Sequence, residues 1–290
     1  MSRGQAADAE PVTHGAGQGG WLALPRHVVL LGATFLVVAP VAFAILTSLK
    51  TLNNYGFDKL GLPDPVFWGN FPTALRGGRF FLWFLNSAIL SFGSVLLSTA
   101  VSAFGAYAFA RMEFRGRGAL LAIVSSLMII PPVVMLIPLF ILLSWSGMNN
   151  TYWGAIFVYA GLVTPFSVYM LTNFFKTIPH EIIESAVIDG ASSFDILRRV
   201  LLPLSAPALI TMVVVNTLWV WNDLLVALVL LNKDSLRTLM VGITVFGSRY
   251  NSDVPVAMAG MLMASVPMLL LYLFGQRYFI RGMVAGAVKG

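Results

Sequence analysis

Long apolar runs separated by short polar stretches dominate the pattern of this 290-residue chain. A helix needs about 20 consecutive apolar residues to cross the hydrocarbon core of a bilayer. Six segments meet that requirement, and they run approximately over residues 28–49, 82–110, 119–143, 152–175, 204–231 and 256–276. The pattern predicts an all-α integral membrane protein with six transmembrane helices in a single domain, residues 28–290.

The first apolar run could be confused with a secretory signal. Its uncharged stretch, residues 28–49, is too long for the apolar core of a signal peptide. We therefore expect a retained helix. Gly, Ala and Gln are abundant at the start of the chain, in residues 1–20, where apolar residues are few. Such a composition cannot bury enough surface to order itself, so we predict a flexible tail over residues 1–27.

The composition supports the membrane assignment and removes several kinds of chemistry. Hydrophobic residues make up 58% of the chain, charged residues only 10%, and the mean hydropathy is +0.84. Soluble domains carry charge on roughly a quarter of their positions. The chain has no cysteine, and His14, His27 and His180 lie outside the apolar runs. Disulfides, iron–sulfur clusters and thiolate metal sites are thereby excluded, and we expect no metal site, no catalytic residue and no resident cofactor.

The basic residues stand at the ends of apolar segments, where they set topology, so the net charge of +6 does not indicate nucleic-acid binding. With the N-terminus inside, 11 of the 18 Lys and Arg residues are cytoplasmic: Arg3, Arg26, Arg111, Arg115, Arg117, Lys176, Arg198, Arg199, Arg277, Arg281 and Lys289. The remaining 7 are outside: Lys50, Lys59, Arg76, Arg79, Lys233, Arg237 and Arg249. We predict a multi-pass protein with both termini in the cytoplasm.

One long polar segment, residues 176–203, interrupts the apolar pattern and has the signals of two short helices. Pro179 suits a first helical turn, Glu184 lies toward the positive end of the helix dipole, and Gly190 can end the helix in the left-handed conformation. The first helix is expected over about 178–189. In the second, Ser192 is the predicted N-cap, with Asp195 three residues later, as in a capping box.

The first of these helices has an apolar face, made of Ile182, Ile183, Ala186 and Val187. We expect Ile183 and Val187 to pack against the protein's own helices. From periodicity alone, the hairpin is equally compatible with an amphipathic connector that lies on the lipid headgroups.

The hairpin also contains a motif. Glu184-Ser185-Ala186, then Gly190, then Val200-x-Leu202-Pro203 resembles the EAA signature of the permease subunits of ABC importers. Ser185 and Val200 replace the usual Ala and Ile, and both replacements are conservative. The stretch from Trp219 to Leu228 is similar to the Trp-Asn-Glu-Phe-x-x-Ala-Leu stretch of the carbohydrate-importing branch, with Asp223 in place of Glu and Leu224 in place of Phe. From about residue 28 onward the chain resembles the maltose-type permeases.

The resemblance implies a type I ABC importer permease fold (MetI-like) in a bacterial or archaeal plasma (inner) membrane. Its implied partners are a second permease subunit, two ATP-binding subunits that bind ATP and Mg, an extracytoplasmic sugar-binding protein, a sugar substrate and membrane lipid. In this family the EAA hairpin is a coupling helix that docks on an ATPase. The corresponding residues here are Glu184, Ser185, Ala186, Asp189, Gly190 and Pro203. The chain lacks the Gly-x4-Gly-Lys-Ser/Thr phosphate loop, so a partner would hydrolyse the ATP.

Few polar residues lie within the predicted spans. Asp223 is the only acidic one, and such a residue is by default a candidate for facing a cavity, although on a continuous helix it would lie near the external interface. Trp219 and Asn222 offer a stacking face and an amide for a sugar, and an interfacial aromatic belt explains the tryptophan equally well. Asn86 is the remaining candidate for the substrate path, and helix packing also accounts for it.

Two external segments complete the chain. Residues 50–81 are expected to form an irregular cap, and residues 232–255 form the loop before the last helix. In maltose-type permeases the latter loop reaches toward the binding protein, which makes Thr244, Gly247 and Tyr250 the candidate contacts here.

The rival classes are a permease for a non-sugar solute, a secondary transporter that works without ATP, and an intramembrane hydrolase. A secondary transporter would need coupling groups deep in the membrane, and the predicted spans contain no His, Lys, Arg or Glu there. A hydrolase would need a His-Glu-x-x-His pair, paired aspartates or a Ser/His dyad, and none of these can be assembled.

Overall fold

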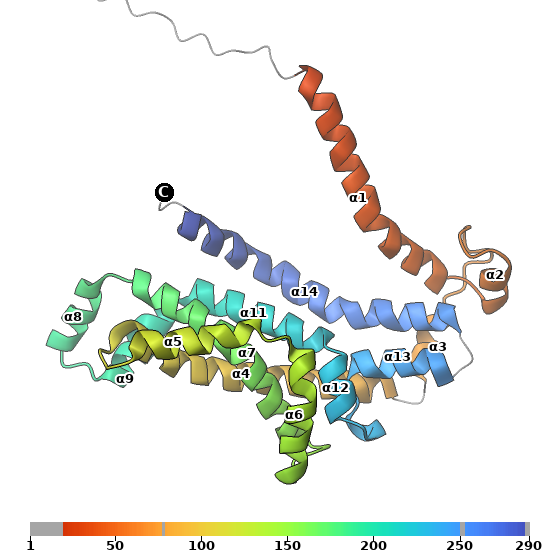
Figure 1. The fold of residues 1–290 in the computed structure, drawn as a ribbon. Coiled ribbons are helices and arrows are strands. Elements are labelled where there is room, and N and C mark those ends of the chain that lie inside the picture. Colours follow the sequence, from red (N-terminus) through yellow and green to blue (C-terminus); the bar gives the residue numbers. More distant parts are fainter. Residues whose placement is uncertain (1–19, 77–78, 250–252, 288–290) are drawn as a thin grey trace, which may run out of the picture.

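The computed structural model describes residues 20–76, 79–249 and 253–287, and every regular element within those ranges is a helix (Figure 1). Four helices are long and apolar enough to cross a membrane, and they cover Arg26–Ser48, Arg79–Arg111, Tyr152–Thr177 and Val254–Gln276. Two bent helix pairs bring the total to six if each pair is one span. The all-α class is confirmed, and the prediction of six spans holds only when the bent pairs are included.

The centre of the fold is the pair α4 (Arg79–Arg111) and α7 (Tyr152–Thr177). Small residues let the two backbones approach: a Cβ added to Gly93 would lie 2.8 Å from Ile156 Cδ1. Ser94, Ser98 and Ser102 on the same helix are fully buried. Close contact through small residues is how helices associate in lipid, where the hydrophobic effect cannot hold them together. α11 (Ala206–Asn222) and α14 (Val254–Ala287) pack against each other, and α11 also contacts α4 and α7.

The third predicted span, 119–143, is not one helix. α5 (Arg117–Ser126) and the 3-10 turn η1 (Leu127–Ile129) end before Pro131, and α6 (Pro132–Trp145) leaves at an angle of 103°. Pro131 and Pro132 cannot donate to the helical ladder, and a residue that precedes a proline is restricted to extended backbone. Ile130 has that conformation, with φ −77° and ψ 117°.

The fifth predicted span, 204–231, is interrupted as well. α11 ends at Asn222, Asp223 is extended with ψ 133°, and a separate helix, α12 (Leu225–Leu230), follows. The carboxylate of Asp223 accepts a hydrogen bond from the Ala227 N–H at 3.1 Å, so this side chain satisfies the backbone of α12 and competes with the continuation of α11. Asp223 therefore lies at a helix break. The expectation that it lies near the external interface assumed a continuous helix.

The N-terminal boundary also differs from the prediction. α1 (Gly20–Ser48) begins within the segment expected to be a flexible tail, because a helix that has already nucleated can be extended one residue at a time at little cost. Residues 1–19 lie outside the described ranges. α1 diverges from the other helices, and the apolar stretch that qualifies it as a span is not buried anywhere within the protein (Figure 1). Its last residues, Thr47 and Ser48, are fully buried.

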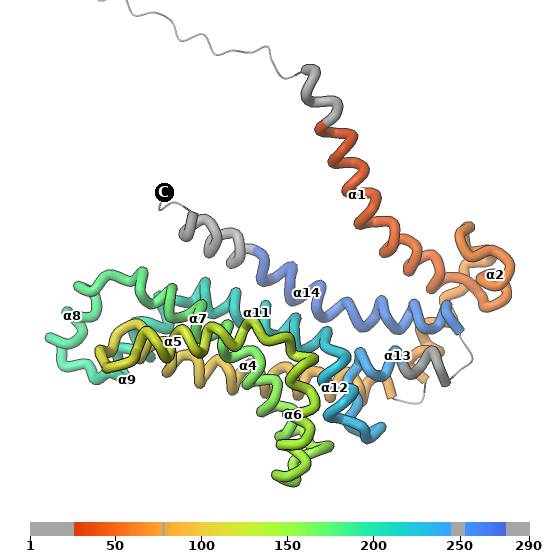
Figure 2. Tube along the Cα trace, viewed as in Figure 1, coloured from red at the N-terminus to blue at the C-terminus, as the bar shows by residue number. Residues whose placement is uncertain are grey.

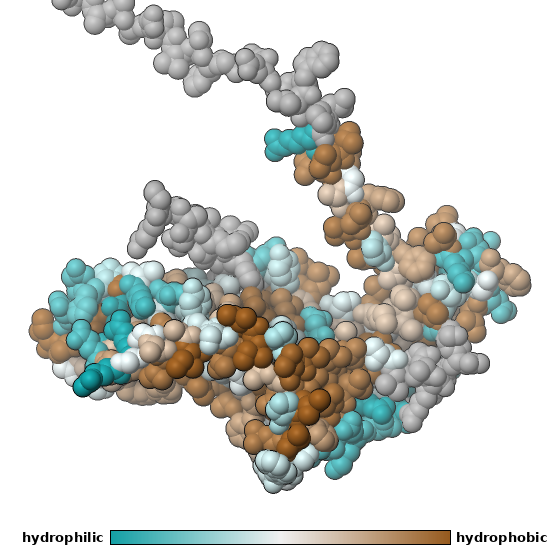
Figure 3. Space-filling view, in the orientation of Figure 1, coloured by the Kyte–Doolittle hydropathy of each residue, from teal (hydrophilic) through white to brown (hydrophobic). Residues whose placement is uncertain are grey.

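The bundle has two distinct ends. At one end, called here the hairpin end, the chain runs from α7 through α8 (His180–Ile188) and α9 (Ser193–Asp195) into α11 (Figure 2). Polar residues gather there, whereas the surface over α5 and α6 is apolar (Figure 3). At the other end, called here the α13 end, lie α2 (Leu52–Phe57), α3 (Asn70–Leu75), the 3-10 turn η3 (Asp234–Leu236) and α13 (Leu239–Arg249).

The segment expected to be an irregular cap, residues 50–81, is thus partly helical and is tied to the bundle through buried polar groups. The Asn70 amide donates to the carbonyls of Ser48 and Lys50, at 2.8 Å each. Lys50 is itself fully buried, and its Nζ donates to the Asp58 carbonyl at 2.7 Å. These bonds fix the chain where it leaves α1.

Candidate functional site

The first arm of the hairpin, α8, ends as the sequence predicts. Gly190 has φ +82°, in the left-handed region that favours glycine. Its N–H donates to the Val187 carbonyl at 3.0 Å, and the Ala191 N–H donates to the Ala186 carbonyl at 2.9 Å. These two bonds form a Schellman cap, so the turn between the arms has one defined shape.

The second arm begins with the predicted capping box. The Asp195 N–H donates to Ser192 Oγ at 3.2 Å, and the Ser192 N–H donates back to the Asp195 carboxylate at 3.3 Å. The Ser192 hydroxyl also donates to the Asp195 carboxylate at 2.5 Å, and this bond, together with the one from the Ser192 N–H, holds the pKa of the Asp195 carboxyl below its usual value. Arg199 Nε lies 3.3 Å from the same carboxylate. Beyond Asp195 the arm widens into a π-helical turn, η2 (Ile196–Leu201), and continues through α10 (Leu202–Leu204) to meet α11 at an angle of 79°. Pro203 is exposed within α10.

The apolar face of α8 is only partly covered. Ile183 is buried in a cluster with residues of α4, α7 and η2, including Ala106, Phe175 and Leu197, and Ala186 packs at its edge. Val187 is 56% exposed, which corrects the expectation that it packs against the protein's own helices. The side chain simply points away from the bundle, as do the neighbouring Ile182 and Ile188, the latter 85% exposed. A short helix therefore presents uncovered apolar side chains at the polar hairpin end.

The polar residues of the motif surround that surface. Glu184, Ser185 and Asp189 are all exposed, and Glu184 Oε1 lies 3.1 Å from His180 Nδ1 at the start of the helix. Ser185 Oγ donates to the Ile182 carbonyl at 3.0 Å, within its own helix. The hairpin thus offers carboxylates and aliphatic side chains together on a rigid, capped scaffold.

Arg111, at the end of α4, anchors the hairpin and was not found as a site residue from the sequence. Its Nη2 donates to the carbonyls of Phe175 and Ile178, the second at 2.6 Å, where α7 ends just before α8 begins. A cation that hydrogen-bonds the last carbonyls of a helix stabilises that end. The sequence shows only that Arg111 is a basic residue at the end of an apolar run. Such a residue is explained equally well as a determinant of membrane topology.

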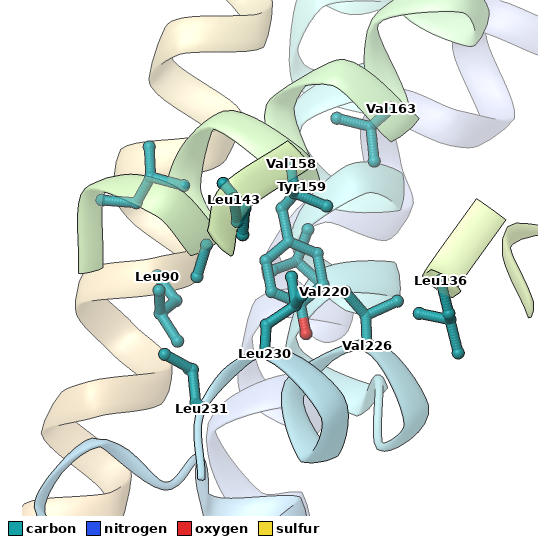
Figure 4. Close-up of a cluster of buried hydrophobic side chains, with 12 residues drawn as sticks. Leu90, Leu136, Leu143, Val158, Tyr159, Val163, Val220, Val226, Leu230 and Leu231 are labelled. Atoms are coloured by element: carbon teal, nitrogen blue, oxygen red, sulfur yellow. The ribbon is translucent and has the colours of Figure 1, made fainter. Parts of the chain in front are cut away.

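A hollow of about 440 Å³ lies at the break between α11 and α12, and Pro131, Trp219, Asn222 and Asp223 are among its lining residues. Asp223 accepts a hydrogen bond from Tyr159 Oη at 2.7 Å, and the Tyr159 ring lies edge-on to Trp219 at 6.2 Å. Figure 4 shows the Tyr159 hydroxyl within a cluster of buried aliphatic side chains that includes Val220 and Val226. The structure thus brings together three residues that the sequence put forward for a substrate path.

A larger cavity, of about 700 Å³, adjoins the same region and shares Pro132 and Trp219 with it. Its walls come from η1, α6, α7 and α11 and are mostly aliphatic, with Asn216 among the few polar residues. The Asn216 amide donates to Ser167 Oγ at 2.7 Å, which links α11 to α7. Trp219 lines both the hollow and the larger cavity.

Asn86 lies where α4 contacts the segment before α13, in agreement with the packing alternative. It is fully buried, and its amide donates to the carbonyls of Ser235 and Arg237 at 2.9 and 2.8 Å, while its Oδ1 accepts from Tyr152 Oη at 2.6 Å. Its hydrogen-bonding groups are directed into the protein, because partners 149 and 151 residues away fold back over α4. We therefore withdraw it from the candidate substrate path.

The predicted binding-protein contacts lie around α13. Thr244 is exposed on that helix, Gly247 lies within it, and Tyr250 lies outside the described residues. No cluster of three or more His, Asp or Glu side chains that could hold a metal occurs within the ranges that the structure describes.

Comparison with known proteins gives concordant results. Residues 101–283 match the family model described as the binding-protein-dependent transport system inner membrane component. A putative ABC transporter permease protein of Caldicellulosiruptor sp. is 40% identical over 258 residues, covering 89% of this chain and 94% of its own length. The melibiose/raffinose/stachyose import permease protein MelC of Bacillus subtilis is 34% identical, covering 91% of this chain and 97% of its own.

The osmoprotective compounds uptake permease protein GgtD of Synechocystis is 33% identical, with 93% of each chain covered. Among solved structures, a chain of a bacterial ABC transporter involved in alginate import has the same fold. The TM-score is 0.78 with 23% sequence identity, and 91% of this chain and 98% of that chain are covered.

Proposed function

Because this chain belongs to the family of inner membrane components of binding-protein-dependent transport systems, we propose that it is the permease subunit of an ATP-driven importer of sugars. The resemblance identified from the two sequence motifs is thereby confirmed at the level of the family. Relatives named for the import of melibiose, raffinose and stachyose and for the transport of α-glucosides support sugar as the substrate class. In this proposal the chain forms half of a translocation pathway that opens alternately to the two sides of the membrane.

The observation that carries the proposal is the uncovered hairpin. An isolated permease would gain by burying Ile182, Val187 and Ile188, yet all three face outward from a capped helix beside Glu184. Such a surface suits a partner that supplies an apolar groove and a basic residue or helix N-terminus for the carboxylate. Two ATP-binding subunits that hold ATP and Mg are the partners proposed here, and the hairpin end is accordingly the cytoplasmic end. Both chain termini then lie in the cytoplasm.

The hairpin can transmit movement because it is tied firmly to the bundle. Ile183 packs into the cluster formed with α4 and α7, and Arg111 joins the end of α4 to the end of α7. A displacement of α8 by closing ATPases therefore moves α4 and α7 together. The rest of the assembly comprises a second, different permease subunit and an extracytoplasmic sugar-binding protein at the α13 end, where Thr244, Gly247 and Tyr250 are the proposed contacts.

The hollow at the α11–α12 break is the proposed part of the substrate path. Its volume is within the range of about 300–1,000 Å³ typical of ligand sites. Trp219 provides an aromatic face, Asn222 provides amide donors and acceptors, and the Asp223 carboxylate is held in place by Tyr159. An aromatic plane beside hydrogen-bonding groups is the chemistry that recognises a sugar ring with its hydroxyls.

Reconstitution tests the function. The chain would be co-purified with its candidate ATPase and second permease, and ATP turnover would be measured with and without a loaded sugar-binding protein. We expect stimulation in the wild type and its loss in Glu184→Lys, which reverses the charge on the docking surface. Full assembly and stimulation in Glu184→Lys would show that Glu184 is only a solvated surface charge and would remove the site from the proposal.

Uptake into proteoliposomes identifies the transported solute. The relative named for osmoprotective compounds favours a second candidate, a non-sugar solute. Radiolabelled oligosaccharides, compatible solutes and amino acids would be compared with the matching binding proteins. Uptake of oligosaccharides supports the sugar assignment, and uptake of another solute alone replaces it. Uptake that persists without ATP would instead indicate a secondary transporter.

A further inference from the structure

The segment between α12 and α13 is held by side chains from two other places in the chain, α4 and the loop before α7. Asn150 Oδ1, in the loop before α7, accepts from the N–H groups of Asn232 and Lys233 at 2.6 and 3.2 Å. The Asn86 amide donates to the carbonyls of Ser235 and Arg237. These bonds place a polar clasp, defined as Asn86, Ser87 and Asn150, around residues 232–239.

The clasp continues into the first turn of α13. Ser87 Oγ accepts from the Leu239 N–H at 2.8 Å, next to Asn86 on α4. One helical turn earlier on α4, the Trp83 ring lies so near α13 that a Cβ on Gly242 would come within 2.2 Å of it. The position and direction of α13 are therefore set by α4, through a close backbone contact and through hydrogen bonds.

Asn86 is the centre of this arrangement. It is fully buried, and its amide donates two hydrogen bonds to the segment before α13. Its carbonyl oxygen accepts a hydrogen bond from Tyr152 Oη at the start of α7. This bond to Tyr152 fixes which way the amide is turned.

We propose that Asn86 is a positioning residue that presents residues 232–239 and α13 to the extracytoplasmic binding protein, and thereby sets how strongly that protein engages the importer. The inference rests on the proposed function, since it requires such a partner at the α13 end. Asn86 touches neither cargo nor ATPase. Its loss should weaken the response to the binding protein and leave ATP turnover without it intact.

The decisive variant is Asn86→Asp, which keeps the shape of the side chain. Its carboxylate can still accept from Tyr152, but it sets an oxygen without hydrogens against the carbonyls of Ser235 and Arg237, where two donors are needed. Because the chain has no cysteine, a spin label can be placed at the exposed Lys233 through Lys233→Cys. The matched control is Asn216→Ala, at a second buried asparagine that bonds Ser167, away from the clasp.

In the reconstituted complex we expect Asn86→Asp to mobilise the label at position 233 and to raise the half-saturating concentration of loaded binding protein by about tenfold or more, since two buried hydrogen bonds are lost. Basal ATP turnover should stay within about twofold, the uncertainty expected for a change remote from the ATPase contacts. Acidifying the outer solution should partly restore the response of Asn86→Asp, whose neutral carboxyl regains one donor, and should not restore Asn86→Ala. The label should remain immobile in Asn216→Ala.

Contrary results have distinct meanings. If the wild-type complex shows no stimulation by any binding protein, the proposed function fails first. If the wild type is stimulated and Asn86→Asp leaves both the label and the half-saturating concentration unchanged, the positioning role is wrong. A change in the KM for cargo with an immobile label would also overturn it and would return Asn86 to the substrate path.

Discussion

The exposed end of α8 allows a quantitative test of coupling. Ile188→Ala removes three carbon atoms from a side chain that is 85% exposed in the isolated protein. Burial is worth about 0.8 kcal/mol for each such carbon. If an ATPase groove covers the side chain fully, the variant loses about 2 kcal/mol of docking free energy, which corresponds to about a thirtyfold rise in Kd. Because alanine is the best helix former, α8 itself should not be weakened.

The assay is binding of the purified ATPase to immobilised permease complex in nanodiscs, together with the thermal unfolding temperature of the permease. Ile183→Ala is the matched control, because it makes the same chemical change five residues earlier, where the side chain is buried. It should destabilise the protein by about 2–5 kcal/mol and lower its unfolding temperature.

A rise in Kd of less than about threefold for Ile188→Ala would mean that the side chain stays uncovered in the complex, since even half burial predicts more than that. A fall in unfolding temperature comparable to that of Ile183→Ala would show that Ile188 belongs to the protein's own core. Either result would refute the assignment of this surface to docking.

Three further outcomes are expected. Arg111→Gln removes the charged donor from the Phe175 and Ile178 carbonyls. The variant should lose about 1.5–3 kcal/mol of stability in thermal unfolding and should transport less solute per ATP hydrolysed. An unchanged ratio of transport to ATP hydrolysis would show that Arg111 has no role in coupling through the hairpin. Gly93→Val should destabilise by about 1–3 kcal/mol through the clash with Ile156, whereas Gly32→Val in α1, with open space around it, should be neutral in the same melting experiment. Tyr159→Phe leaves the Asp223 carboxylate without its hydroxyl donor and should lower uptake with ATPase assembly intact; normal uptake would remove this pair from the substrate path.

How much of this could be predicted from the sequence depends on the range of the interactions. The hairpin caps were found because Ser192, Asp195 and Gly190 act on backbone groups within a few residues, so their spacing alone identifies them. The third and fifth apolar runs were each assigned to a single span because hydropathy measures only how apolar a segment is and does not register backbone direction. Pro131 and Pro132 contained the signal for the first break, and Asp223 contained the signal for the second.

The roles of Arg111 and Asn86 could not be predicted in the same way. Arg111 bonds carbonyls 64 and 67 residues away, and Asn86 bonds carbonyls 149 and 151 residues away. Both residues bind main-chain oxygens, which every residue has, so the partner positions have no recognisable side-chain signature. Only the folded arrangement of α4 against α7 and α13 reveals them.

The clasp has a consequence for how such a protein can diversify. Asn86, Ser87 and Asn150 hold residues 232–239 entirely through backbone N–H and carbonyl groups. The side chains of Asn232, Lys233, Asp234 and Ser235 are exposed, so the clasp does not constrain their identity. Mutation can therefore change the charges displayed on this edge of the α13 end while the path of the backbone stays the same. A duplicated gene could acquire a new extracytoplasmic partner there without losing a working membrane core.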